Sequence, residues 1–287
     1  MVDTRRLEQL LRDRRPASTA PSQAARVADA QGFRVRAAVR SRAGQSDAVR
    51  AAWAALPELD TEPGRTGSTA GAMAAASGNL RQFDESFDLL RAQLLQALRT
   101  RGWQSIGITA PVRGCGASFV SLSLARSFAR LDNVRTALLD LDLEAGALAD
   151  SLGTAPDGHI SDLIAGDLAP AEYLCRAGRN LALGLTAPFP EGAATLFHND
   201  ALTQTLAEIT TEYRPDVILC DLPPLLTEDS TLAALPSLDA VLIVADGTRT
   251  QARDLSECER LLQDRTQLLG VVLNRGVDTA AARRAHH

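Results

Sequence analysis

Apolar residues recur along this chain at two alternating spacings. Phe83, Phe87, Leu90, Leu94 and Leu98 recur every three or four positions, which predicts an amphipathic helix. Short, nearly all-apolar runs bounded by turn residues follow this helix and are typical of buried strands. The expected strands are Ser105–Thr109, Thr136–Leu141, Leu181–Leu185, Asp216–Cys220, Ala240–Val244 and Leu268–Leu273. Between the strands we expect a helix that follows the first strand and ends at about Arg130, helices over Leu202–Tyr213 and Gln251–Gln263, and short helices in 146–178.

Apolar strands that alternate with helices predict an α/β fold with a doubly wound, mainly parallel sheet covered by helices on both faces. Ligands of such sheets bind at the carboxyl ends of the strands. The pattern places the folded domain at residues 79–278. Residues 1–78 are expected to be a mostly disordered basic arm rich in Ala and Arg, with a helical turn or two around Asp47–Leu56, and residues 279–287 a disordered tail.

A loop rich in Pro and Gly, PVRGCGAS, joins the first strand to the next helix. The order strand, glycine loop, helix is the layout of a P-loop, in which backbone N–H groups and the helix N-terminus form an anion site. The motif G-x-x-x-x-G-K-[ST] requires lysine where this chain has Ala117, although Gly116 and Ser118 are in place. The loop therefore keeps the pattern of a phosphate site without its lysine.

No lysine elsewhere can substitute, because all 30 basic residues of the chain are arginine. Arg113, four residues upstream of Ala117, is the candidate substitute, since a guanidinium can bind phosphate through two hydrogen bonds. Its side chain leaves the loop from a different point than the lysine would. The sequence alone leaves open whether Arg113 reaches the phosphates or is solvated.

Three acidic residues, Asp140, Asp142 and Asp221, stand at strand ends. Transfer of a phosphoryl group needs Mg²⁺ to bridge the phosphates and carboxylates to hold the metal and its waters. Any one Asp after a strand is more simply a turn residue or helix cap, but three beside a glycine loop favour a nucleotide site. The predicted Mg²⁺ ligands are Ser118, Asp140 and Asp221, and the predicted catalytic acids are the three aspartates.

Charge is unevenly distributed. Residues 1–78 carry 12 Arg against 8 acidic residues, whereas the remainder carries 18 against 27. A mildly basic arm on an acidic domain argues against nucleic acid as the main partner. Residues 4–15 could form a short docking helix for a partner or an anionic membrane, or they could be a frayed solvated terminus. The frayed terminus is favoured, because so short a helix is marginal alone.

The remaining composition is that of a cytoplasmic protein. The four cysteines are widely spaced, which favours reduced thiols over disulfides or a metal site. No apolar run approaches the length of a transmembrane helix, and the start lacks the apolar core of a signal peptide. We expect a cytoplasmic location, with membrane association at most peripheral at the inner face of the plasma membrane.

The motifs ITAPVRGCGAS, ALLDLDLE, DVILCDLPP, AVLIVADG and LLGVVLNR, in this order over residues 80–275, resemble the bacterial tyrosine kinases (BY-kinases) of capsule and exopolysaccharide synthesis, within the MinD/ParA-like deviant P-loop ATPases. The resemblance implies a P-loop NTPase fold that binds ATP or ADP with Mg²⁺. It also implies a membrane polysaccharide co-polymerase or related export protein as partner, and a homo-oligomer. The family's functional residues would fall on the Walker A residues Arg113, Gly114, Cys115, Gly116, Ala117 and Ser118, the Walker A′ acids Asp140 and Asp142, the Walker B acid Asp221, and Asn274 and Arg275 beside the adenine.

The chain departs from the family pattern at several points besides Ala117. Val112 stands where MinD/ParA-type loops have an extra lysine. The family's oligomer motif E-x-x-R-x-x-R here reads Glu85, Asp88, Arg91, so its middle Arg is an acid. The family's kinases carry a C-terminal tyrosine cluster, and the tail GVDTAAARRAHH has no tyrosine, which predicts no autokinase activity on this tail.

Two hypotheses of different class follow. The favoured one is a degenerate P-loop protein that binds ATP or ADP and acts as a catalytically impaired regulator or partner in exopolysaccharide or capsule synthesis and export. The other is an active Mg-dependent ATPase or kinase of the same pathway in which Arg113 replaces the lysine. A third, weaker hypothesis is a scaffold with an empty site.

Overall fold

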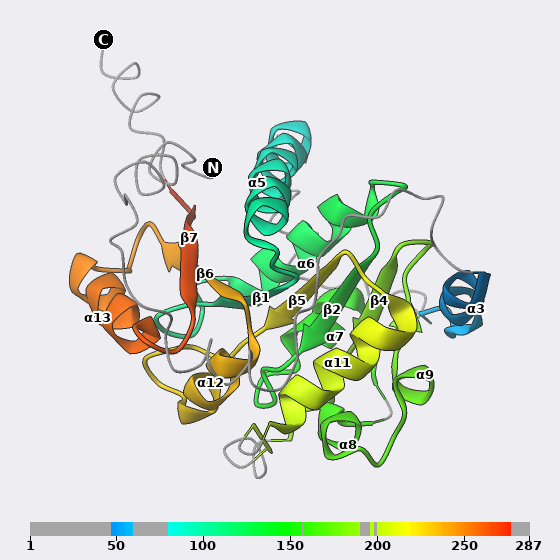
Figure 1. Ribbon diagram of the computed structural model, residues 1–287. Helices are drawn as coiled ribbons and strands as arrows, with labels where there is room; N and C mark the ends of the chain where they lie inside the picture. Colours follow the sequence, from blue (N-terminus) through cyan, green and yellow to red (C-terminus); the bar gives the residue numbers. More distant parts are fainter. Residues whose placement is uncertain (1–46, 60–79, 157, 190–195, 198–199, 277–287) are drawn as a thin grey trace.

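The computed structural model describes residues 47–59, 80–156, 158–189, 196–197 and 200–276, which form a layered α/β domain (Figure 1). Its seven-stranded sheet has the order β3-β4-β2-β5-β1-β6-β7 and is parallel except where β3 pairs antiparallel with β4. The strands are β1 Ser105–Thr109, β2 Thr136–Asp140, β3 Cys175–Arg176, β4 Leu181–Gly184, β5 Val217–Asp221, β6 Ala240–Asp246 and β7 Gln267–Asn274. The α-helices are α3 Asp47–Ala55, α5 Leu80–Arg101, α6 Ala117–Ala129, α7 Ala147–Leu152, α8 Ile160–Ala165, α9 Pro170–Tyr173, α11 Ala201–Tyr213, α12 Asp229–Ala234 and α13 Ala252–Leu262.

The sheet is buried on both faces, as its continuous apolar strands predict. Successive residues of a strand point to opposite faces, so Leu138 packs into one core with α5 and α6, whereas Ala137 and Leu139 pack into the other. That second core includes residues of α3, α8, α11, α12 and α13. The predicted fold class, a doubly wound and mainly parallel sheet between two helical layers, is confirmed.

Strand β1 lies near the centre of the sheet, between β5 and β6. Asp221, the last residue of β5, is the register partner of Ile108 in β1 and of Asp140 in β2. Because parallel strands end at the same edge of the sheet, the glycine loop after β1 and the acids of β2 and β5 meet there. The fold therefore assembles the strand-end residues at one place.

Strand β3 and helix α12 have no counterpart in the sequence pattern. Strand β3 has only two residues, too few to show an alternation, and it forms by pairing Cys175 with Leu183 and Arg176 with Ala182. Helix α12 has six residues, of which Ser230, Thr231 and Ala234 are buried. Tertiary packing, rather than local periodicity, determines both elements.

Helix α3 belongs to the segment expected to be an arm, and it packs on the domain. The indole Nε1 of Trp53 donates a hydrogen bond to the Tyr213 carbonyl at 2.7 Å, and Arg176 N donates one to the Pro57 carbonyl at 2.8 Å. Trp53 is 4% exposed. The helical turn allowed around Asp47–Leu56 is thus present, and the rest of residues 1–78, apart from 47–59, lies outside the described residues, as does the 279–287 tail.

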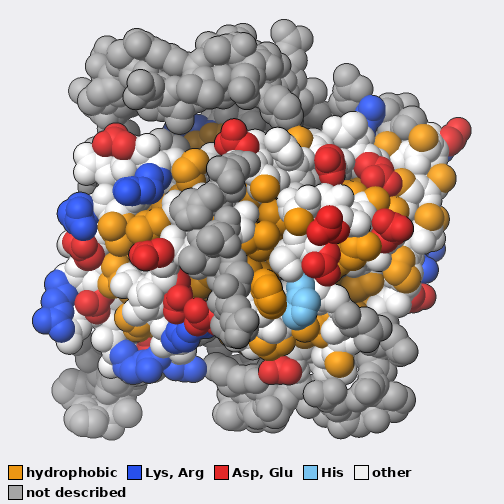
Figure 2. All heavy atoms as spheres, turned by 90° about the horizontal axis from the view of Figure 1, so that it is seen from below, with side chains coloured by type: hydrophobic (Ala, Val, Ile, Leu, Met, Phe, Trp, Pro, Cys, Tyr) orange, Lys and Arg blue, Asp and Glu red, His pale blue; other side chains and the backbone are white. Residues whose placement is uncertain are grey.

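The surface carries the acidic excess of the composition. Figure 2 shows one face of the molecule, on which acidic side chains are spread among apolar ones while basic side chains gather toward one side.

Within the described ranges, no helix is long and apolar enough to span a bilayer.

Candidate functional site

The glycine loop turns between β1 and α6 through two left-handed residues. Gly114 has φ +82° and Gly116, which precedes α6, has φ +94°. A Cβ at Gly116 would lie 2.3 Å from Asn274 Nδ2, and one at Gly114 would lie 2.9 Å from Arg249 Nη2. Both positions require glycine, because of the backbone angle and because side chains approach closely.

Those approaching side chains hold the loop by its carbonyl groups. Asn274 Nδ2 donates to the Cys115 carbonyl at 2.9 Å. Arg275 Nη1 donates to the Gly114 carbonyl at 3.2 Å, and Arg249 Nη2 to the Arg113 carbonyl at 3.4 Å. In a trans peptide the C=O and the next N–H point in opposite directions. The N–H groups that follow these carbonyls therefore face away from the three side chains.

A buried carboxylate positions the two arginines. Asp246 at the end of β6 is fully buried, and its Oδ2 accepts from Arg275 Nη1 at 2.9 Å and from Arg249 Nε at 3.3 Å. Burial tends to raise the pKa of Asp246, but hydrogen bonds from Thr248, Arg275 and Arg249 outweigh it and lower the pKa to about 2. Asp246 and Arg249 were not among the predicted site residues, although Asp246 ends an apolar strand as the three predicted acids do.

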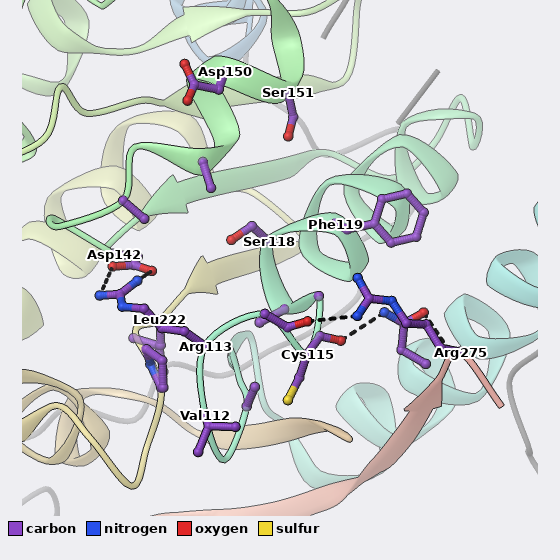
Figure 3. Close-up of a pocket in the computed structure, with 18 residues that line it drawn as sticks. Val112, Arg113, Cys115, Ser118, Phe119, Asp142, Asp150, Ser151, Leu222 and Arg275 are labelled. Atoms are coloured by element: carbon purple, nitrogen blue, oxygen red, sulfur yellow. Dashed lines mark hydrogen bonds and ion pairs between the residues drawn. The ribbon is translucent and has the colours of Figure 1, made fainter. Parts of the chain in front are cut away.

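The loop forms one wall of a cavity of about 410 Å³. Figure 3 shows Ser118 and Arg275 around it, with Asp150 and Ser151 of α7 across from the loop. The structure thus brings together all eight predicted nucleotide-binding residues. Those that line the cavity are Arg113, Gly114, Cys115, Gly116, Ala117, Ser118, Asn274 and Arg275, together with the predicted acid Asp142.

Asp140 and Asp221 lie fully buried at the edge of the sheet beside the loop. Ser121 Oγ donates to Asp221 Oδ1 at 2.8 Å. Asp142 N donates to Asp140 Oδ1 at 3.2 Å. The Oδ2 atoms of Asp140 and Asp221 have no hydrogen-bond partner among the described residues. Unpaired buried carboxylate oxygens are costly, so this arrangement is typical of a site that a cation completes.

Burial sets the protonation of this pair. It raises the pKa of Asp140 well above its ordinary value, and the neighbouring Asp221 and Asp142 carboxylates raise it further. Burial also raises the pKa of Asp221 to about 7, although hydrogen bonds from Ser118 and Ser121 oppose the shift. At neutral pH without a cation, the pair therefore retains protons that the unfolded chain releases.

Asp221→Asn is expected to stabilise the ligand-free protein at pH 8. The native carboxyl contributes stability that is present below about pH 4 and is lost as the pH rises through about 7, since the fold raises the pKa of Asp221 from its ordinary value of 3.8 to about 7. A neutral amide removes that loss, so Tm should rise by roughly 10 °C at pH 8 and hardly change at pH 4. Thermal unfolding followed by circular dichroism at both pH values measures this.

Asp246→Asn is the matched control, because the pKa of this buried aspartate is lowered to about 2. Its carboxylate contributes stability above about pH 4 that is lost as the pH falls through 2. The control should lower Tm at pH 8. If Asp221→Asn lowered Tm at pH 8 as well, the assigned protonation of Asp221 would be wrong.

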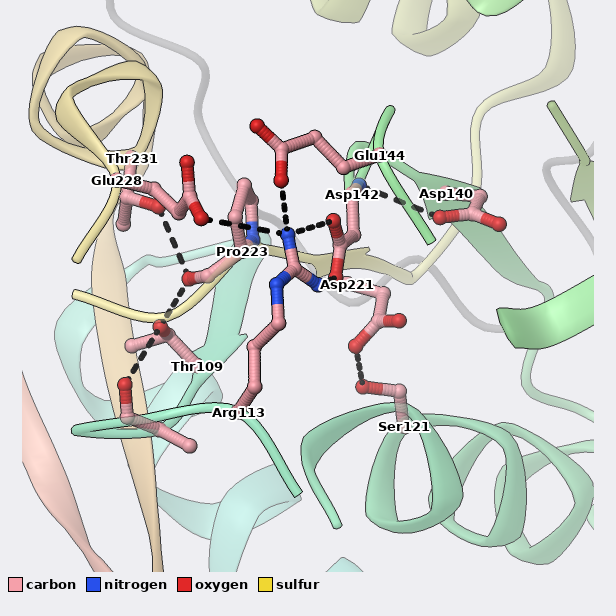
Figure 4. A network of polar contacts seen from close by, with 11 residues as sticks. Thr109, Arg113, Ser121, Asp140, Asp142, Glu144, Asp221, Pro223, Glu228 and Thr231 are labelled. Atoms are coloured by element: carbon pink, nitrogen blue, oxygen red, sulfur yellow. Dashed lines mark hydrogen bonds and ion pairs between the residues drawn. The ribbon is translucent and has the colours of Figure 1, made fainter. Parts of the chain in front are cut away.

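Arg113, the candidate substitute for the lysine, is turned toward acidic side chains. Its guanidinium makes two hydrogen bonds to Asp142, at 2.8 and 3.2 Å, and also contacts Glu144 and Glu228 (Figure 4). It nevertheless lines the cavity. Its position at the cavity thus comes with three carboxylate partners that the sequence pattern did not reveal.

The residues present fit a magnesium ion bound together with phosphates. No group of three or more His, Cys, Asp or Glu side chains forms a metal cage in the part of the chain described. Mg²⁺ is usually held by one or two carboxylates, waters and substrate phosphates rather than by such a cage. Ser118, Asp221 and Asp140 supply a hydroxyl and two carboxylates with unpaired oxygens, next to a loop suited to anions.

The altered oligomer motif lies on α5, where Asp88 is engaged within the chain. Asp88 Oδ1 accepts from Ser127 Oγ at 2.6 Å and from Arg91 Nη1 at 2.7 Å. Arg91 Nη1 also donates to the Ser127 carbonyl at 2.6 Å. The acid that replaces the motif's middle Arg therefore ties α5 to α6.

Comparison with known proteins places this domain. No family model matches the chain. The chain is 29% identical over 195 residues to the "Putative tyrosine-protein kinase EpsB" of Ralstonia nicotianae. The aligned region covers 66% of this chain but 25% of that relative. The chain therefore spans about a quarter of the length of the curated relatives it matches.

Solved structures share the fold. The kinase domain of the Escherichia coli tyrosine kinase ETK has a TM-score of 0.62 at 22% identity, over 68% of this chain and 76% of that one. Cobyrinic acid a,c-diamide synthase from Mycobacterium smegmatis, with bound ATP analog and magnesium, has a TM-score of 0.51 at 22% identity, over 60% of this chain and 72% of that one. These similarities confirm the resemblance drawn from the motifs: the chain is similar in sequence to putative tyrosine-protein kinases of the EpsB type and shares the P-loop NTPase fold of solved tyrosine-kinase domains.

Proposed function

We propose that this chain binds ATP or ADP with Mg²⁺ in the cavity at the glycine loop and is catalytically impaired. The observation that carries the proposal is the combination at one cavity of a braced glycine loop, unpaired buried carboxylate oxygens and Ala117 at the lysine position. Backbone N–H groups of the loop and the N-terminus of α6 would hold the phosphates. Asn274 and Arg275, at the cavity wall, would flank the adenine.

The metal would be held by Ser118, Asp140 and Asp221, and when bound it would neutralise phosphate charge. Lysine normally adds a charge-assisted contact to the same phosphates. Ala117 cannot make it, and charge stabilisation is the main catalytic device of phosphoryl transfer. Turnover should therefore suffer more than binding, so retention of nucleotide is the function that this site supports best.

The cellular role is proposed from the relatives. Similarity to tyrosine kinases of the EpsB type supports a regulatory or partner role in exopolysaccharide or capsule synthesis and export. The partner would be a membrane polysaccharide co-polymerase or related export protein, which would place the chain in the cytoplasm, at most peripherally at the inner face of the plasma membrane. Self-association into a homo-oligomer is part of the same proposal.

Calorimetric titration with Mg-ATP and Mg-ADP tests the binding. We expect dissociation constants in the micromolar to sub-millimolar range and about tenfold weaker binding by Gly116→Ala, because its Cβ would displace Asn274 from the loop. Ser123→Ala on the same helix, outside the cavity lining, is the matched control and should bind normally. The absence of binding at millimolar nucleotide would favour a scaffold with an empty site.

The second candidate is an active ATPase, favoured by the position of Arg113 at the cavity. Steady-state hydrolysis separates the two. Turnover at ordinary rates, about 1–100 s⁻¹ for kinases, that Asp221→Asn and Arg113→Met both abolish would establish the active enzyme and contradict impairment.

A further inference from the structure

Arg113 ties the glycine loop to two other loops. Asp142 and Glu144 follow β2, whereas Glu228 precedes α12. The guanidinium reaches Asp142 Oδ2 and Glu144 Oε2 at 2.8 Å each and Glu228 Oε1 at 3.4 Å. Figure 4 shows the guanidinium between these acids. One side chain thus connects three segments at the mouth of the cavity.

The three contacts differ in how exposed they are. The Asp142 side chain is 8% exposed and is held by two hydrogen bonds, whereas the Glu144 and Glu228 side chains are 39% and 21% exposed and each makes one. Exposed ion pairs are weak, because water solvates the separated charges well. The contacts to the two glutamates are therefore the ones that a stronger anion would displace first.

The charges around Arg113 do not balance. One guanidinium faces three carboxylates, and burial together with the nearby Glu144 raises the pKa of Glu228, which marks the crowding of negative charge. A cavity suited to phosphates thus has an acidic mouth. While Arg113 is shared among these acids, it is the cation that limits their repulsion of an anionic ligand.

We propose that Arg113 is an exchangeable latch, which the phosphates of a bound nucleotide take over from Glu144 and Glu228. The latch rests on the proposed function, since the displacing anion is the nucleotide at the same cavity. In the free protein, Arg113 clamps the loops after β2 and before α12 to the glycine loop. On binding, the guanidinium turns to phosphate, for which its planar donors are well suited, and keeps Asp142. The two glutamates are then released, which couples nucleotide occupancy to the freedom of the loop before α12.

A double-mutant cycle tests the exchange. Glu144→Gln with Glu228→Gln is made in the Arg113 protein and in Arg113→Met, and Mg-ATP binding is measured by calorimetry. If the glutamates compete with phosphate for Arg113, the double substitution should tighten binding about 3- to 10-fold more in the Arg113 protein than in Arg113→Met, where only the relief of repulsion remains. Equal tightening in both backgrounds would mean general repulsion and would overturn the latch.

Asp150→Asn is the matched control for charge. Asp150 lines the same cavity but belongs to α7 and is not an ion-pair partner of Arg113 in the described structure. It should change Mg-ATP affinity by the same factor with or without Arg113. If the cycle gave a coupling between Asp150 and Arg113 as large as that between the glutamates and Arg113, the coupling would not be specific to the latch.

Hydrogen exchange measures the two states of the latch separately. In the ligand-free protein, Arg113→Met should raise amide hydrogen exchange at residues 142–146 and 226–230. In the Arg113 protein, addition of Mg-ATP should raise amide hydrogen exchange at residues 226–230. Unchanged exchange in Arg113→Met would overturn the clamp. If no variant bound Mg-ATP, the proposed function would fail, and the exchange of Arg113 from the glutamates to phosphate would fail with it. If Mg-ATP bound but the glutamate substitutions had no effect, only the latch would be overturned.

Discussion

Ala117→Lys is expected to tighten Mg-ATP binding about 10- to 100-fold, since a charge-assisted hydrogen bond contributes roughly 1.5–3 kcal/mol. Ala117 is the first residue of α6 and lines the cavity, so a lysine there would extend into the phosphate site. Ala and Lys differ little in helix propensity, so the fold should tolerate the change. The same charge should raise ATP hydrolysis from undetectable to measurable, because it acts on the transition state as well.

Calorimetry and a coupled ATPase assay measure the two effects. Ala117→Met is the matched control, because it adds a side chain of similar length without charge. If Ala117→Lys bound Mg-ATP no more tightly than Ala117→Met, the remaining site would not hold phosphates as a P-loop does. If binding tightened but hydrolysis stayed absent, the loss of activity would extend beyond the lysine, for example to the acids engaged by Arg113.

Trp53→Ala is expected to lower the free energy of unfolding by about 3 kcal/mol, the lower end of the range for truncation of a buried tryptophan. Trp53 contacts Tyr213 edge to face at 6.1 Å, and the Arg135 guanidinium lies 5.5 Å from its ring centre. Its loss also leaves the Tyr213 carbonyl without the indole donor. The corresponding fall in Tm is about 6–12 °C. Urea and thermal unfolding measure both quantities.

The second tryptophan of the chain is the control. Trp103 is half-buried and lies under Arg101 at 5.2 Å, so Trp103→Ala should cost less. Hydrogen exchange should rise over α3 in Trp53→Ala only. A loss below about 0.5 kcal/mol in Trp53→Ala would show that α3 does not dock stably on α11, and that the folded domain begins at α5.

Much of the site could be predicted because its residues stand in recognisable local contexts. A strand, a glycine loop and a helix adjoin in the sequence, and each of Asp140 and Asp221 ends an apolar run. Parallel strands end at one edge of a sheet, which is enough to expect these acids beside the loop. The structure confirms that proximity through the pairing of Asp140 with Asp221.

The brace of the loop could not be predicted in the same way. Arg249, Asn274 and Arg275 lie more than 100 residues after the loop, and their contacts to its carbonyls depend on β6 pairing with β1 and on β7 pairing with β6. Likewise, Glu228 meets Arg113 only because β5 and β1 are neighbours. Long-range contacts of this kind leave no periodicity in the sequence.

The sequence by itself determined the fold class, the glycine loop, its missing lysine and the strand-end acids, because each depends on local spacing or on residue identity. Only the tertiary structure decided where the charge of Arg113 goes, which carboxylate oxygens stay unpaired and that α3 joins the core. These depend on which segments the sheet order brings together, and a phosphate loop without its lysine is therefore understood from the neighbours that surround it.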